Sequence, residues 1–162
     1  MVATVQIVEK NGTAGTNTQK DSGTVRFRNS DSATVDANNP LVIPTAGTEY
    51  SYEKWLRLKV TVAPDNNISN LKAYTDGANG WTGVGLHAKA VATYATPALA
   101  TATAGYTNAF TYTSGAALNL GTAAVTGTGE KGSHCVMIMT VGTTATQGTL
   151  TAETLTFSYD ET

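Results

Sequence analysis

Residues 127–132, GTGEKG, have the spacing GxGxxG that could cradle a dinucleotide. In dinucleotide-binding proteins this turn joins a strand to a helix, and the pyrophosphate lies at the N-terminus of that helix. The residues that follow here, from Ser133 onward, have the pattern of a strand instead. We therefore interpret residues 127–132 as a loop between strands and predict no cofactor.

Acidic and amide side chains near two turns could supply oxygen ligands to Ca²⁺ if the turns met in space. They are Asp65, Asn66, Asn67, Asn70, Asp76 and Asn79. Their spacing matches no calcium-binding loop, and asparagine and aspartate are also the usual residues of turns. We predict turns and no metal site, while the sequence leaves open whether the turns at Asp65 and Asp76 bind an ion or a sugar.

The side chains that could act as a nucleophile and a base are those of Cys135 and His134. Adjacent residues of a strand point to opposite faces, so these two cannot form a catalytic pair. His87 could reach His134 across two strands, but two histidines without a third ligand make a poor zinc site. The GxSxG, HExxH and P-loop motifs are absent from the sequence. We predict no catalytic residue and no enzymatic activity.

Four aromatic residues, Tyr50, Tyr52, Trp55 and Trp81, could form a platform for a sugar ring. Tyr50 and Tyr52 are two residues apart and should share one face of a strand, which places Trp55 on the other face. Aromatic side chains on strands more often belong to a core or cover an edge. Glycan binding is therefore an alternative and not the main interpretation.

The segments that must position these residues have the patterns of β-structure. In residues 50–63, YSYEKWLRLKVTVA, apolar and polar residues alternate from Leu56 to Val62, as in a strand with one buried face. Threonine is abundant, glycine and asparagine mark turns, and no segment has the pattern of a long helix. Further strands are expected at 2–9, 24–28, 33–37, 68–75, 81–94, 110–113, 118–125, 133–141 and 149–159.

These strands predict a single all-β domain over residues 1–162. We expect an antiparallel β-sandwich with a jelly-roll-like arrangement of about eight to ten strands. Residues 1–22 are expected to form an extended N-terminal strand or an arm, which could add to the sheet of a neighbouring subunit.

Charge and cysteine content narrow the function. The net charge of −2 gives no electrostatic reason to expect nucleic-acid binding, and the single cysteine excludes an intramolecular disulfide. We recognise no signal peptide or membrane-spanning segment, so we expect synthesis in the cytoplasm. After Ala90 the only charged side chains are Glu130, Lys131, Glu153, Asp160 and Glu161. Either threonine hydroxyls keep this half soluble, or neighbouring subunits cover part of it.

Four stretches resemble a family of small structural proteins of tailed bacteriophages. They are KDSGTVRFRN, YSYEKWLRLKVT, NLKAYTDGANGWTGV and TTATQGTLTAETLTFSYDE. The similarity runs from about Val2 to Glu161 and involves whole segments without a catalytic motif. Small all-β proteins of such virions commonly serve as capsid decoration (cement) proteins, often as trimers, and others form tail tubes, head–tail connectors or fibre modules.

The resemblance implies a virion protein that binds the outer surface of the capsid and stabilises the shell. Its partners would be the major capsid protein and copies of itself, with a trimer favoured, and many weak contacts would combine through avidity. The residues that we expect in subunit or capsid contacts are Val2, Val5, Ile7 and Trp81. The alternatives are a tail tube, connector or fibre component, and a glycan-binding sandwich carried on the virion.

Overall fold

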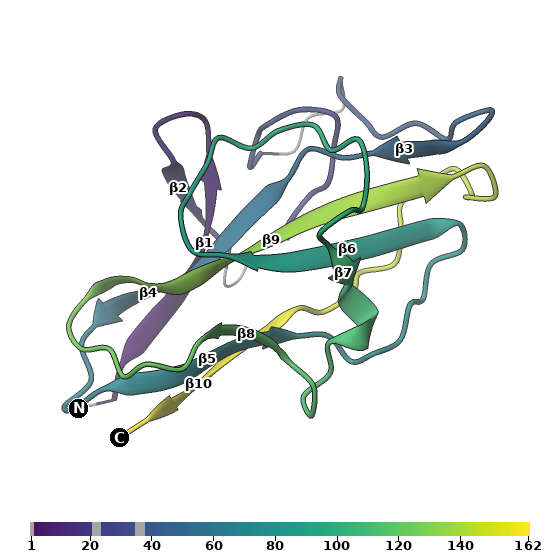
Figure 1. Cartoon of the computed structure of the whole chain (residues 1–162). Helices are drawn as coiled ribbons and strands as arrows, with labels where there is room; N and C mark the ends of the chain where they lie inside the picture. The colour runs from purple at the N-terminus through teal and green to yellow at the C-terminus, as the bar shows by residue number, and fades with distance from the viewer. Residues whose placement is uncertain (1, 21–23, 35–37) are drawn as a thin grey trace.

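The computed structural model describes residues 2–20, 24–34 and 38–162. These residues contain ten strands and one turn of 3₁₀ helix (Figure 1). The elements are β1 (Thr4–Asn11), β2 (Thr16–Gln19), β3 (Thr48–Tyr50), β4 (Lys54–Val62), β5 (Ile68–Tyr74), β6 (Val84–Val91), β7 (Thr107–Asn108), η1 (Ala109–Thr111), β8 (Leu118–Gly121), β9 (Gly129–Gly142) and β10 (Thr156–Glu161).

The strands form two antiparallel sheets of unequal size. The larger sheet has seven strands in the order β2-β1-β4-β9-β6-β7, with β3 also paired to β9, and the smaller sheet has the order β10-β5-β8. The smaller sheet lies below the larger one in Figure 1, and the two chain ends meet at the same end of the molecule. The predicted all-β antiparallel sandwich is therefore confirmed.

The main core lies between the two sheets. Leu56, Leu58 and Val60 of β4 are at most 2% exposed, as the alternation in residues 50–63 predicts. They pack in one cluster with Leu71 of β5 and Leu120 of β8. A second cluster on the larger sheet contains Val84, Met139 and Val141, and the chain segments that join strands cover it in place of the smaller sheet.

The opposite face of the larger sheet is covered by residues 92–108, which follow β6 and end with β7 (Figure 1). The ring of Tyr94 meets the buried ring of Trp55 edge-on, with 5.3 Å between the ring centroids. The Glu53 carboxylate accepts hydrogen bonds from the Trp55 indole and from the Tyr106 hydroxyl. These contacts hold the connecting segment against the sheet.

A fully buried ion pair joins β1 to β4. The Lys54 ammonium lies 2.9 Å from the Glu9 carboxylate, and neither side chain is exposed. Lys54 also donates to the carbonyl oxygen of Ser32 at 2.6 Å, and Lys20 lies 3.5 Å from the second carboxylate oxygen of Glu9. Burial lowers the pKa of Lys54, and the charge of Glu9 acts in the opposite direction. The pair fixes the segment around Ser32 to the sheet.

Gly132 allows β9 to pass close to the smaller sheet. Its φ of +68° lies in the left-handed region, and a Cβ atom there would lie 2.7 Å from the carbonyl oxygen of Leu120 and 3.0 Å from a methyl carbon of Leu71. The pairing of β4 with β9 is irregular at the same place, between Leu56 and Leu58. A glycine is thus needed at position 132 for two reasons: the positive φ, and the lack of room for a Cβ atom beside Leu120.

Several local predictions were wrong because tertiary contacts decide the structure there. Residues 24–28, predicted as a strand, form none, and Arg28 within them is only 3% exposed. The predicted strand at 110–113 falls on η1 and the residues after it. Strand β2 lies outside the predicted strands, and the predicted loop at 127–132 contains the first residues of β9.

Two other predicted segments are only partly described. In the predicted strand at 33–37, only residues 33–34 are described, and they form bends. The described part of residues 1–22 contains β1 and β2, which form a hairpin within this chain's own sheet. In the described residues, this part of the chain is built into the larger sheet.

Replacing Lys54 should remove the nearer of the two cations beside the buried Glu9 carboxylate and leave Lys20 at 3.5 Å. We expect Lys54→Met to lower the free energy of unfolding by about 3–5 kcal/mol, the usual cost of breaking a buried pair from one side. Urea denaturation measures this change. The control is Lys59→Met on the same strand, where Lys59 is only partly buried and a change within about 0.5 kcal/mol is expected. Equal losses in the two variants would contradict the role of the pair.

A comparison of two glycines separates conformational strain from steric conflict. Gly127 has a φ of +69°, almost that of Gly132, but a Cβ atom on Gly127 would meet nothing within 4 Å. We expect Gly127→Ala to lower the free energy of unfolding by about 1–2 kcal/mol through φ alone. Gly132→Ala should lose about 1–3 kcal/mol more because the new methyl group meets Leu120. Thermal and urea denaturation of the two variants would reveal the difference, and similar losses would contradict the close approach of β8 and β9.

Candidate functional site

Three of the four residues expected to make contacts with partners line a single cleft. Val5 and Ile7 on β1 are partly buried beside the main core, and Trp81 lies before β6. Val2 is 75% exposed and does not line the cleft. The structure therefore brings Val5, Ile7 and Trp81 to one feature and leaves Val2 apart from it.

The cleft lies along the side of the sandwich and has a volume of about 1400 Å³. Strands β1, β4, β6 and β9 form one wall, and β10 with residues 24–27, 40–43 and 145–155 forms the other. The lining is mostly apolar, but it includes Lys20, Arg26 and Glu153. Such a cleft can bury an apolar partner and still orient charged groups at its rim.

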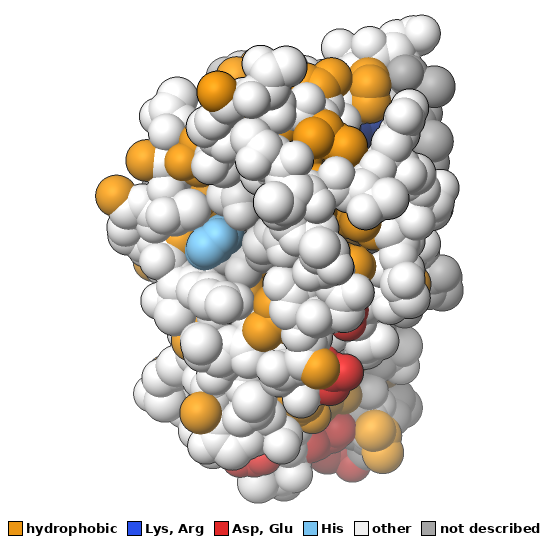
Figure 2. Space-filling view, turned by 90° about the vertical axis from the view of Figure 1, so that its right-hand side faces the viewer, with side chains coloured by type: hydrophobic (Ala, Val, Ile, Leu, Met, Phe, Trp, Pro, Cys, Tyr) orange, Lys and Arg blue, Asp and Glu red, His pale blue; other side chains and the backbone are white. Residues whose placement is uncertain are grey.

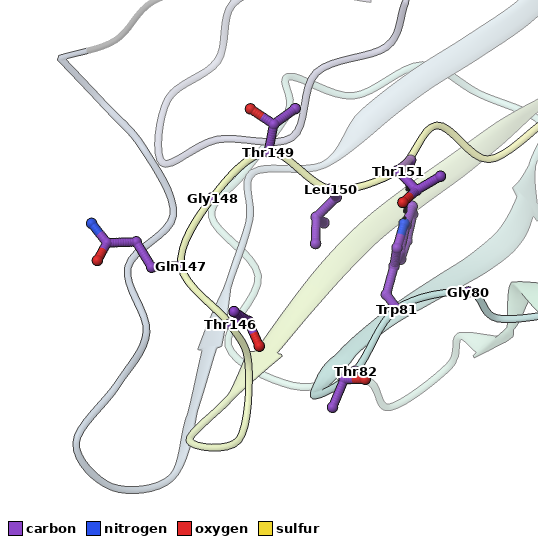
Figure 3. Close-up of a pocket in the computed structure, with 9 residues that line it drawn as sticks. All are labelled: Gly80, Trp81, Thr82, Thr146, Gln147, Gly148, Thr149, Leu150 and Thr151. Carbon is purple, nitrogen blue, oxygen red and sulfur yellow. Dashed lines mark hydrogen bonds between the residues drawn. The ribbon is translucent and has the colours of Figure 1, made fainter.

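A smaller hollow of about 230 Å³ lies beside the cleft at Trp81. Its other walls are residues 80, 82 and 146–151, so four threonines and one aromatic residue line it (Figure 3). The Trp81 indole donates to the carbonyl oxygen of Thr151 at 2.7 Å, and its ring meets Phe110 edge-on at 5.8 Å. Gln147 points away from the other labelled side chains in Figure 3. The tryptophan mainly fixes the 146–151 segment.

The four candidate aromatic residues do not form one platform. Trp55 is 3% exposed and packs against Tyr94 and His134, whereas Trp81 packs against Phe110. The two tryptophans therefore belong to separate packing sites, and no flat pair of rings faces solvent there.

His134 and Cys135 point to opposite faces of β9, as predicted. His134 contacts Trp55 on one face, and Cys135 belongs to the main core on the other. Neither residue is exposed. Burial lowers the pKa of His134, and burial raises the pKa of the Cys135 thiol to about 12, so the thiolate is disfavoured at neutral pH.

Of the residues considered as Ca²⁺ ligands, Asp76 and Asn79 bond within their own turn, whereas the Asn70 amide donates to the Asp160 carboxylate of β10 at 2.6 Å. Asp76 accepts from the backbone N–H of Ala78, and Asn79 bonds to the backbone of Trp81 and Val84. Across residues 2–20, 24–34 and 38–162, no three His, Cys, Asp or Glu side chains gather as a metal-binding group.

The GTGEKG segment contains the first residues of β9, and its Glu130 belongs to a cluster of ion pairs. Glu130, in β9, contacts Lys10 at 2.8 Å and Arg57 at 3.1 Å. Burial raises the pKa of Glu130, but hydrogen bonds from Lys10 and Asn17 and the charges of Lys10 and Arg57 outweigh it and lower this pKa to about 2. The motif therefore helps to join β1, β4 and β9, which the sequence reasoning missed.

The side of the molecule that Figure 2 shows carries almost no basic side chains. Figure 2 shows scattered apolar side chains, one histidine and many uncharged polar groups, with acidic side chains near the lower edge. The connecting segment at residues 92–108 has no charged residue, and most of its residues are exposed. Leu99 within it is 42% exposed. The surface formed by residues 92–108 suits contact with another protein better than contact with nucleic acid.

Comparisons with known proteins give no relative from which to transfer a function. No family model matches the sequence, and no curated protein and no solved structure matches it either. Within the described parts of the chain, no helix has the length and apolar character needed to span a membrane.

Removing the Glu130 carboxylate should change the acid sensitivity of the fold. The ionised form is favoured in the folded state, so its contribution is complete above the ordinary pKa of 4.5 and is lost as the pH falls toward 2. We expect Glu130→Gln to lower the free energy of unfolding at pH 7 by about 1 kcal/mol, since the cluster is partly exposed. We also expect this variant to lose less stability than the wild type between pH 4.5 and pH 2.

Urea denaturation at several pH values tests the Glu130 assignment. Glu49→Gln is the control, because the described structure records no ion pair for Glu49. If Glu130→Gln and Glu49→Gln had the same pH profile, the Glu130 cluster would have no special role in acid stability.

Proposed function

We propose that this chain is a structural protein of a tailed-bacteriophage virion, most specifically a capsid decoration protein. It binds the outer surface of the assembled capsid and stabilises the shell. Its partners are the major capsid protein and copies of itself, arranged as a trimer. The proposal rests on the resemblance of four sequence stretches and on one physical observation, the shortage of exposed charge.

Charged residues make up 14% of the sequence, compared with about 25% in a typical soluble domain. Part of this small set lies inside the domain, because Glu9, Arg28 and Lys54 are buried. Others, such as Glu130 and Lys10, are held in partly buried pairs. The solvent-exposed surface is therefore poorer in charge than the composition indicates. Such a surface suits a subunit that neighbouring proteins cover in the assembled state.

The 92–108 segment is the surface that we assign to the capsid. It has no charged residue, it exposes alanine, threonine and Leu99, and Tyr94 and Tyr106 hold it against the sheet. A surface held in this way loses little conformational entropy on binding. Many copies on a lattice need only a modest affinity for each contact, because the contacts between subunits add avidity.

The alternatives are a tail tube, a connector, a fibre component or a glycan-binding module on the virion. A glycan-binding module needs exposed aromatic rings, but Trp55 is buried and Trp81 is packed against Phe110. A tube or connector would assemble into rings in solution. These alternatives predict binding to glycans or large ring-shaped assemblies, whereas the decoration role predicts binding to capsids.

Binding to capsids tests the proposal directly. Purified protein is mixed with mature, undecorated capsids of the phage whose genome encodes this chain, and the bound protein is measured after sedimentation. We expect saturable binding by the wild type and at least a tenfold loss of affinity in Thr101→Glu/Ala104→Glu, because both positions are exposed within the 92–108 segment. Decorated capsids should also resist heat and low salt better than undecorated ones.

A matched pair of substitutions elsewhere controls for added negative charge. Thr122→Glu/Ala123→Glu changes the same two residue types at exposed positions outside the segment and should bind like the wild type. The absence of saturable wild-type binding would contradict the decoration role. Equal binding by the two double variants would show that residues 92–108 are not the contact surface.

A further inference from the structure

The sandwich has an open side where two strands lack a neighbour among the described residues. β10 is the outermost strand of the smaller sheet and pairs only with β5. On β1, the pairing with β2 covers residues 8–11 and the Lys20 N–H donates to the carbonyl oxygen of Ile7, so that residues 4–6 have β4 as their one strand neighbour in the described part of the chain. An unpaired strand edge presents backbone N–H and C=O groups that a further strand can bind.

The same side contains the large apolar cleft. Residues 5–7 of β1 and residues 156, 157 and 159 of β10 line it together. At the end near the chain termini, the backbone N–H of Ala3 donates to the Glu161 carboxylate, which connects the two sheets there. The rest of the cleft is bordered by residues 24–27 and 40–43, including Val42, which is 55% exposed.

The combination of strand edge and cleft identifies the chemistry of the occupant. A lipid or another purely apolar ligand would fill the cleft but would leave the backbone groups of β10 without hydrogen-bond partners. An extended peptide satisfies both requirements, because its backbone pairs with β10 while alternate side chains enter the cleft. The rim adds charge selectivity through Arg26, which is exposed there; the other cation of the lining, Lys20, lies beside Glu9, and the Glu153 carboxylate accepts from the backbone N–H of Gly80.

We propose that this open side accepts an extended segment of a partner protein as an additional strand on β10. The segment has apolar residues at alternate positions and an acidic residue near Arg26. A second copy of this chain offers no such segment from its described ends, since these already lie in β1 and β10. The inference concerns a different surface from the 92–108 segment and does not depend on the virion role.

A displayed library of nine-residue peptides tests the inference with the intact protein. Half of the library alternates apolar and polar residues, and the other half has the same composition with its apolar residues in one block. We expect the alternating half to be enriched, with acidic residues over-represented at one end.

The most enriched peptide is then synthesised, and its dissociation constant is measured by calorimetry. Amide hydrogen exchange of the protein is followed with and without this peptide. Protection should increase at residues 156–161.

Two pairs of variants locate the site. Val42→Asp should weaken the peptide at least tenfold, whereas Val62→Asp, at an exposed valine outside the cleft, should change the dissociation constant less than twofold. Arg26→Glu should weaken an acidic peptide at least fivefold, and Lys72→Glu, at an exposed lysine outside the cleft, should not.

The proposal is overturned by any of four results. The first is no enrichment of the alternating half of the library. The second is that the bound peptide slows amide hydrogen exchange of this chain only outside residues 156–161. The third is equal affinity of the two valine variants. The fourth is an occupant of another kind, shown by dodecanoate binding the cleft more tightly than every selected peptide, or by a dimer whose residues 156–161 are protected without peptide. Loss of capsid binding in the 92–108 variant would leave all of these results unchanged.

Discussion

The structure depends on one long strand, β9, whose backbone forms hydrogen bonds with three neighbouring strands. Its fourteen residues pair with β4 and β3 along one edge and with β6 along the other. A strand that serves so many partners must bend, and it does so at Gly132, where only a glycine fits beside the carbonyl oxygen of Leu120. The same strand places His134 and Cys135 on opposite faces, which removes any catalytic pairing between them. His134 and Cys135, whose side-chain types could carry chemistry, thus both pack inside the fold.

The placement of charged side chains connects the sheet architecture to the proposed role as a capsid decoration protein. The buried pair of Glu9 and Lys54 and the cluster around Glu130 tie β1, β4 and β9 together and leave few charges for the surface. The outer covering of the larger sheet at residues 92–108 is then built from uncharged residues that Tyr94 and Tyr106 hold in place. A well-anchored surface without charge can dock on another protein with little desolvation cost. The open side at β10 differs in kind, because it offers backbone groups beside an apolar cleft.

The sequence predicted the elements that have a simple period and missed those that depend on distant contacts. Alternation identified β4 and β6, in which buried and partly exposed residues alternate, whereas a run of apolar residues identified the second half of β9, which is buried on both faces. It failed for β2, a short polar edge strand, and for Arg28, which is buried by segments far away in the chain. The cleft could not be predicted either, although Val5, Ile7 and Trp81 were selected, because its walls come from separate segments between residues 5 and 159. Glycines 127, 129 and 132 resembled a ligand loop because a bent strand needs the same conformational freedom.

The central claim is that this sandwich is a subunit of the virion's outer shell. A cryo-electron microscopy reconstruction of the infectious particle tests it most directly. The account predicts density for the two unequal sheets on the outer capsid surface, at three-fold or quasi-three-fold positions, with residues 92–108 against the shell. Density for the sandwich in the tail tube, the connector or a fibre, or a capsid surface without it, would contradict the claim.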